Sequence, residues 1–111
     1  VPNHGVLMRT IAADSYRRTR LRFTSYIKTS QVEDSAGLWI RVDSNTQEAI
    51  VIDNMLSKPI RGTTDWRKYV VTVTVPENGA VIKYGIHLRG RGQVWINDPQ
   101  LEVVQTASSL P

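Results

Sequence analysis

The stretch VIKYGIHLRGRGQVWINDPQLEVV, residues 81–104, carries the clearest structural signal in this chain. In its first half, bulky apolar side chains alternate with polar side chains or glycine: Ile82, Tyr84, Ile86 and Leu88 interleave with Lys83, Gly85, His87 and Arg89. A period of two is typical of a strand with one buried face. Gly90 and Gly92 then favour a turn, after which a second strand begins at Gln93. The stretch predicts two antiparallel strands joined by a short turn.

The rest of the chain repeats this alternation. We predict five further strands, over Val6–Ala12, Thr19–Thr29, Gly37–Asp43, Glu48–Asp53 and Tyr69–Val75. Turn-forming residues separate them at 44–47 and 76–79, residues 14–18 have room for one helical turn, 31–35 form a loop, and 54–65 form a longer excursion. Short strands without an amphipathic helix predict an all-β fold, an antiparallel β-sandwich. The spacing favours a jelly roll and leaves an immunoglobulin-like strand order open, although no cysteine is present for its core disulfide.

Size and composition indicate one folded domain. A chain of 111 residues suits a single core, so we expect one β-sandwich domain over residues 1–111, with an ordered part of about 5–104 and flexible ends. The absence of cysteine excludes disulfides and thiolate metal sites. No apolar run is long enough to cross a membrane and no signal peptide is visible, so no membrane partner is expected and a cytoplasmic location is slightly favoured.

Several phrases resemble a known superfamily. They are AGLWIRVD at 36–43, DNM at 53–55, KPIRGTTDW at 58–66, Tyr69, and GQVWIND at 92–98. Together they are similar to the bacterial galactose-binding-like jelly rolls, which are related to carbohydrate-binding modules and are found attached to enzymes or regulators. The resemblance covers roughly Gly5 to Val104. It implies a jelly-roll fold and a non-catalytic binding role.

The chain departs from that family pattern at two places. Relatives usually have a strand before the one placed at Val6, and its absence would leave an open sheet edge. A homodimer or a further N-terminal segment would cover such an edge. Relatives also often have a carboxylate where Asn97 stands, which disfavours the structural calcium that some of them carry. No other cofactor is expected.

The residues opposite the predicted core form the candidate ligand-binding site: Tyr26, Trp39, Arg41, Asp53, His87 and Arg89. Sugars need aromatic platforms for their C–H faces and planar hydrogen-bonding groups for their hydroxyls. Trp39 with the two arginines and His87 supplies both, if the sheet order is that of the family, and Asp53 accepts from a hydroxyl or orients an arginine. An equally weighted alternative has the 54–62 excursion covering Trp39. We expect the other tryptophans, Trp66 and Trp95, to serve packing.

The leading functional hypothesis is a non-catalytic module that binds a carbohydrate or another small polar molecule. One alternative is a structural or interaction domain that dimerises through its open edge. Nucleic-acid binding is less favoured: the net charge is +4, but Arg17 and Arg18 lie in a connection while Arg20 and Arg22 lie on a strand. An enzyme is not expected, because His87 is the single base within the predicted fold and no second histidine stands at a metal-ligand spacing.

Overall fold

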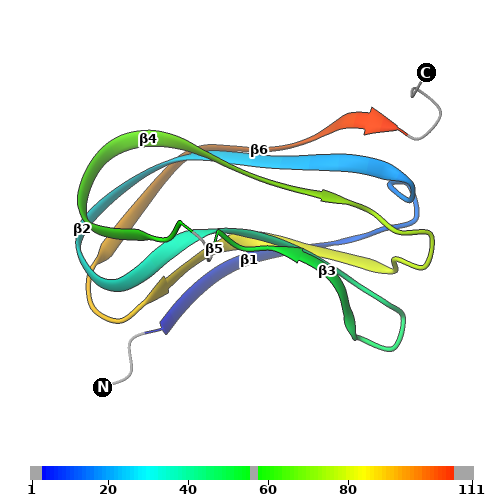
Figure 1. The fold of residues 1–111 in the computed structure, drawn as a ribbon, viewed down its shortest axis with the longest axis horizontal. Helices are drawn as coiled ribbons and strands as arrows, with labels where there is room; N and C mark the ends of the chain where they lie inside the picture. The colour runs from blue at the N-terminus through cyan, green and yellow to red at the C-terminus, as the bar shows by residue number, and fades with distance from the viewer. Residues whose placement is uncertain (1–3, 56–57, 107–111) are drawn as a thin grey trace.

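Six antiparallel strands form two stacked layers (Figure 1). The computed structural model describes residues 4–55 and 58–106. The strands are β1 (His4–Ala12), β2 (Thr19–Asp43), β3 (Ala49–Asp53), β4 (Ile60–Thr74), β5 (Val81–Arg89) and β6 (Gln93–Thr106). This architecture confirms the predicted all-β sandwich. Of the ends expected to be flexible, about 1–4 and 105–111, residues 1–3 and 107–111 lie outside the described residues, whereas residue 4 belongs to β1 and residues 105 and 106 belong to β6.

The long strand β2 belongs to both layers. Its first half, residues 19–30, pairs with β4 on one side and with β6 on the other, which makes the upper layer of Figure 1. Its second half, residues 35–43, lies between β5 and β3, and β1 extends the lower layer beyond β5. A jelly-roll-like sandwich therefore forms around one central strand.

The prediction of a loop at residues 31–35 is wrong, because this segment continues β2. Gln31 adopts a positive φ of 52° and bends the strand. Its N–H donates to the Thr63 hydroxyl, and Glu33 N–H donates to the Arg91 carbonyl, so the backbone stays hydrogen-bonded through the bend. Buried Val32 anchors the same segment in the core. Tertiary hydrogen bonds thus replace the loop that the polar sequence favours locally, and seven predicted strands become six.

The core lies between the layers, where the alternation placed it. The predicted inward residues of β2 are buried: Leu21, Phe23, Ile27, Leu38, Ile40 and Val42. Val71, Val73, Ile82 and Ile86 complete it from the neighbouring strands. The side chains on the outer face of each layer do not contribute to this core, so the two outer faces can differ in polarity and charge. The described part of the chain contains no helix with the length and apolarity needed to cross a membrane.

Candidate functional site

The outer face of the lower layer brings together four of the six predicted site residues. Trp39 and Arg41 point outward from β2, opposite the buried side chains of Leu38 and Ile40. The pairing of β5 with β2 places His87 and Arg89 on this same side. Alternation therefore placed these four side chains on one surface, which we call the Trp39 face; Arg41 and Arg89 lie towards its opposite ends, six residues apart along the paired strands.

Two cations of the Trp39 face share one buried carboxylate. Asp43 is only 2% exposed, and its carboxylate forms ion pairs with Arg41 (Nε to Oδ1, 2.8 Å) and Lys83 (Nζ to Oδ2, 3.3 Å). The Arg41 guanidinium also lies 6.0 Å from the centroid of the Trp39 ring. A buried carboxylate needs such partners, because desolvation would otherwise make its charge very costly. Arg41 therefore has a structural role that limits its freedom to bind a ligand.

The segment after β3 covers another part of the Trp39 face. The N–H of Leu38 donates to Met55 Sδ at 3.3 Å. A Cβ built on Gly37 would lie 3.5 Å from both Met55 Sδ and His87 Cε1, so Met55 and His87 flank this glycine. Trp39 itself is half-buried. The segment after β3 therefore covers the end of the Trp39 face that contains Gly37 and His87.

Asp53 does not lie on the Trp39 face. The register shift between Val42 and Asp43 pairs Asp53 with Ile40, whose side chain points into the core. Asp53 Oδ2 accepts a hydrogen bond of 3.0 Å from the backbone N–H of Thr72 on β4. The sequence prediction for Asp53 is therefore corrected: its carboxylate links the edges of the two layers.

Tyr26 lies on the opposite side of the molecule from Trp39. Both residues belong to β2, but Tyr26 precedes the bend at Gln31 and faces outward from the upper layer. The prediction that these two aromatic residues share one face is wrong. The bend carries the strand from one layer to the other, so the alternation of its two halves refers to two different surfaces.

Two rows of side chains around Tyr26 form a second outward surface, which we call the aromatic face. Its members are Tyr26, Lys28, Trp66, Lys68, Trp95 and Asn97. In one row Tyr26 stands between Asn97 of β6 and Lys68 of β4. In the next row Lys28 pairs with Trp95 of β6. On the other side of Lys28, two residues of β4, Asp65 and Trp66, occupy the register shift between Ile27 and Thr29.

The aromatic face contains three exposed rings. Tyr26, Trp66 and Trp95 are 38%, 43% and 42% exposed. The expectation that both tryptophans serve packing is therefore wrong. The sequence contained a signal for this exposure, because Trp66 has the same parity as the exposed Lys68 and Val70. The predicted strand began at Tyr69 and so left Trp66 out of that series. A bulge at the edge of the sheet explains why the ring is not covered.

A cation accompanies one ring of the aromatic face. The Lys28 ammonium lies 5.6 Å from the centroid of the Trp95 ring, within the range of a cation–π contact. The backbone N–H of Trp66 donates to Asp65 Oδ1 at 2.8 Å, which fixes the backbone of the bulge. Among the described residues, neither Lys28 nor Lys68 forms an ion pair. This surface therefore combines exposed rings with two lysines that no described carboxylate pairs with.

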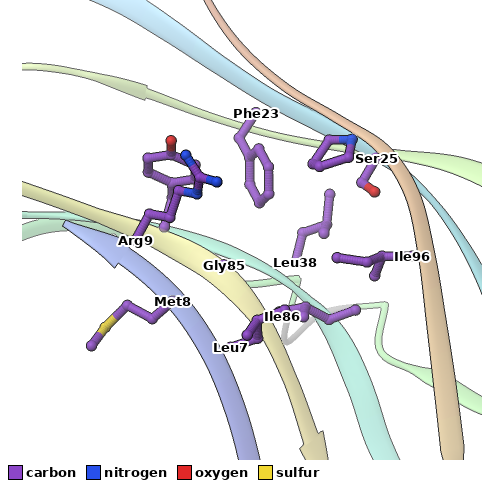
Figure 2. A pocket seen from close by; sticks show the side chains of 11 residues that line it. Leu7, Met8, Arg9, Phe23, Ser25, Leu38, Gly85, Ile86 and Ile96 are labelled. Carbon is purple, nitrogen blue, oxygen red and sulfur yellow. The ribbon is translucent and has the colours of Figure 1, made fainter. Parts of the chain in front are cut away.

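A third feature is an apolar cavity of about 220 Å³ between the layers, on the side where β1 and β6 face each other across the core. Figure 2 shows Phe23 and Ser25 above Leu38, Ile96 at one side, and Leu7 beside Ile86 below. Phe23 packs edge-to-face on Tyr84 with ring centroids 4.9 Å apart. The Ser25 hydroxyl is within hydrogen-bonding distance of the Asn97 carbonyl at 3.1 Å. The cavity therefore offers few polar groups and suits an apolar occupant.

Comparisons with known proteins identify the fold. No protein-family model matches the chain. It is 46% identical over 98 residues to the uncharacterized HTH-type transcriptional regulator YbfP of Bacillus subtilis (strain 168). That match includes 88% of the chain but only 33% of the relative, so the chain spans about a third of that protein's length.

Solved structures similar to the chain share little sequence with it. The enzymatically active domain of tailspike protein 4 of bacteriophage CBA120 has a TM-score of 0.68 at 14% identity, over 94% of this chain and 15% of that one. The CBM22-1 xylan-binding domain of Paenibacillus barcinonensis Xyn10C has a TM-score of 0.61 at 7% identity, over 96% and 86%. A CBM4 structure has a TM-score of 0.50 at 17% identity, over 89% and 61%. The chain has a β-sandwich fold of the carbohydrate-binding-module type.

Proposed function

We propose that this domain is a non-catalytic carbohydrate-binding module whose ligand lies on the aromatic face. The observation that carries the proposal is the exposure of Tyr26, Trp66 and Trp95 on three adjacent strands. Large aromatic rings are on average well buried, so a group of exposed rings points to a binding surface. The apolar C–H faces of sugar rings stack on such platforms.

Polar groups of the aromatic face match the hydroxyls of a sugar. The Asn97 side chain offers both a donor and an acceptor beside Tyr26, and Lys28 and Lys68 offer donors. Oriented polar groups around an apolar platform are the general arrangement of sites for small polar ligands. This composition supports recognition of a carbohydrate over that of a purely apolar ligand.

The relatives support the same function. One similar structure is a xylan-binding domain and another is a CBM4 module, whereas the relative of higher sequence identity is named as a transcriptional regulator. We therefore propose that, within a longer regulator, this domain binds the sugar to which the regulator responds. Such a role needs a binding surface and no catalytic group.

The Trp39 face is the second candidate for the same ligand. It contains Trp39, Arg41, His87 and Arg89, four of the six residues that the sequence predicted for the site. We rank it below the aromatic face for two reasons. Arg41 is engaged with Asp43, and Met55 lies against the region of Gly37 and His87. Neither of these restrictions applies to the rings of the aromatic face.

A matched set of tryptophan variants tests the location. Trp66→Ala and Trp95→Ala are each expected to weaken binding to a soluble polysaccharide about tenfold, the order of magnitude of one lost stacking contact. Trp39→Ala is the control and should bind as the wild type. Affinity gel electrophoresis against a panel of polysaccharides gives the measurement. Wild-type affinity in both Trp66→Ala and Trp95→Ala would remove the aromatic face from consideration.

A second function, self-association, is favoured by a separate observation on β1. Val6, Leu7 and Met8 are 51%, 62% and 50% exposed, and among the described strands β1 pairs only with β5. A second copy of the chain could pair its own β1 antiparallel to this edge and cover the apolar cavity, in a two-fold interface. Light scattering should then show a dimer that Leu7→Lys converts to a monomer. A wild-type monomer at high concentration would refute this function.

A further inference from the structure

We infer that the ligand of the aromatic face is an acidic glycan, a sugar chain that carries carboxylate or sulfate groups. This inference rests on the proposed function and adds the chemical class of the ligand. The charges on the upper layer carry it. Two rows along the same strand from the rings, Arg22 is paired with Glu102 at 2.9 Å. Lys28 and Lys68 have no such partner among the described residues.

The position of Lys28 connects this charge to stacking. Its ammonium lies 5.6 Å from the centroid of the Trp95 ring, and Lys28 stands in β2 between Trp95 and the bulge that contains Trp66. A sugar stacked on either ring would therefore bring an acidic substituent near one ammonium. β4 and β6 are separated by two strand spacings, about 10 Å, which more than one sugar ring must span. The expected ligand is an oligosaccharide or a longer chain.

The distribution of polar groups favours a glycan over single-stranded nucleic acid. Both ligands combine ring stacking with negative charge. A polynucleotide carries a phosphate at every residue and needs a continuous basic track. Carboxylates interrupt such a track here, because Asp65 lies within the bulge beside Trp66, and Asp98 follows Asn97 on β6. These carboxylates repel any anionic group, so a ligand must place its acidic groups beside the lysines and its hydroxyls beside the carboxylates. An acidic glycan carries both kinds of group, whereas the backbone of single-stranded DNA carries phosphates without free hydroxyls.

The test compares polymers of different charge. The probes are polygalacturonate for carboxylates, dextran sulfate for sulfates, neutral xylan and oligothymidylate. The wild type should bind one of the two acidic polymers at least about tenfold more tightly than xylan at low salt, and this preference should shrink at high salt because screening weakens exposed charge pairs. The double variant Lys28→Met/Lys68→Met should lose about tenfold in affinity for the acidic polymer, as expected for two exposed charge contacts.

The control variant is Lys58→Met, since Lys58 is exposed in the segment after β3. It should bind as the wild type, and all three proteins should melt at the same temperature. Tighter binding of xylan than of both acidic polymers, or equal affinity of the double variant, would overturn the acidic class while leaving carbohydrate binding in place. Binding of no polysaccharide at all would overturn the proposed function itself. Binding of oligothymidylate alone would overturn both in favour of nucleic acid.

Discussion

The two outer faces of the sandwich each place a cation beside a tryptophan, yet they differ in what the cation does. On the Trp39 face, Arg41 lies 6.0 Å from the ring and is also bound to the buried Asp43. On the aromatic face, Lys28 lies 5.6 Å from the Trp95 ring and has no carboxylate partner among the described residues. A cation–aromatic pair is therefore not by itself a sign of a binding site. A cation that is also bound to a buried carboxylate has a structural role, whereas a cation without such a partner is available to a ligand.

The largest expected effect on stability comes from a substitution of Gly85, which lies in β5 next to Trp39 of β2. Gly85 pairs with Trp39, and a Cβ added there would overlap the backbone of β1 at Leu7. Gly85→Ala should therefore push β1 away from β5 and lower the free energy of unfolding by about 3 kcal/mol, the upper range for overpacking. Urea denaturation measures this loss. Gly62→Ala is a useful comparison, because nothing lies near its added Cβ and its cost comes only from the positive φ of 75°.

Removal of the buried carboxylate should have the next largest effect. Asp43→Ala leaves Arg41 and Lys83 without their counter-charge, and we expect a loss of about 2 kcal/mol in unfolding free energy, reduced from the fully buried case because both cations reach solvent. The melting temperature and the urea midpoint give the measurement. Glycan affinity at a temperature where the variant is folded should stay unchanged. A loss of affinity in the folded variant would instead assign the binding site to the Trp39 face.

A smaller difference is expected between the tryptophans themselves. Trp39→Ala removes a half-buried ring and should lower the unfolding free energy by about 1 kcal/mol, from the apolar area returned to water. Trp66→Ala removes an exposed ring at an edge bulge and should change stability by less than about 0.5 kcal/mol. Parallel denaturation curves compare the two. Equal losses would contradict the division into a structural face and a binding face.

The smallest effect should come from the Arg22–Glu102 pair, which lies on the upper layer beyond the rings. Both side chains are more than two-fifths exposed, at 43% and 44%. A double-mutant cycle with Arg22→Ala and Glu102→Ala should therefore give a coupling energy of about 0.5 kcal/mol or less. A coupling energy several times larger would show that this surface is rigidly organised by its charges rather than by its strands.

The alternation of the sequence predicts the core well because each half of β2 has one buried face. It gives the inward positions Leu38 and Ile40 and the outward positions Trp39 and Arg41 correctly. It cannot show that the strand changes layer at Gln31, since the bend depends on hydrogen bonds to Thr63 and Arg91, which are distant in sequence.

The site was harder to predict than the core for the same physical reason. Asp53 depends on a register shift in the hairpin. Such a shift changes which face a side chain occupies, because the period of a strand is two. The exposed group of Tyr26, Trp66 and Trp95 exists only after three strands have paired. Sequence parity alone therefore could not assemble it.

The sharing of β2 by both layers also has a consequence for cooperativity. This one strand of 25 residues pairs with β3, β4, β5 and β6, so neither layer can open fully without disturbing the other. Unfolding should then be a single transition, and a ligand that binds only the native state stabilises every part of it by linkage. Amide protons of β5, on the layer remote from the rings, should exchange more slowly in the presence of the glycan, to the extent that they exchange through global opening.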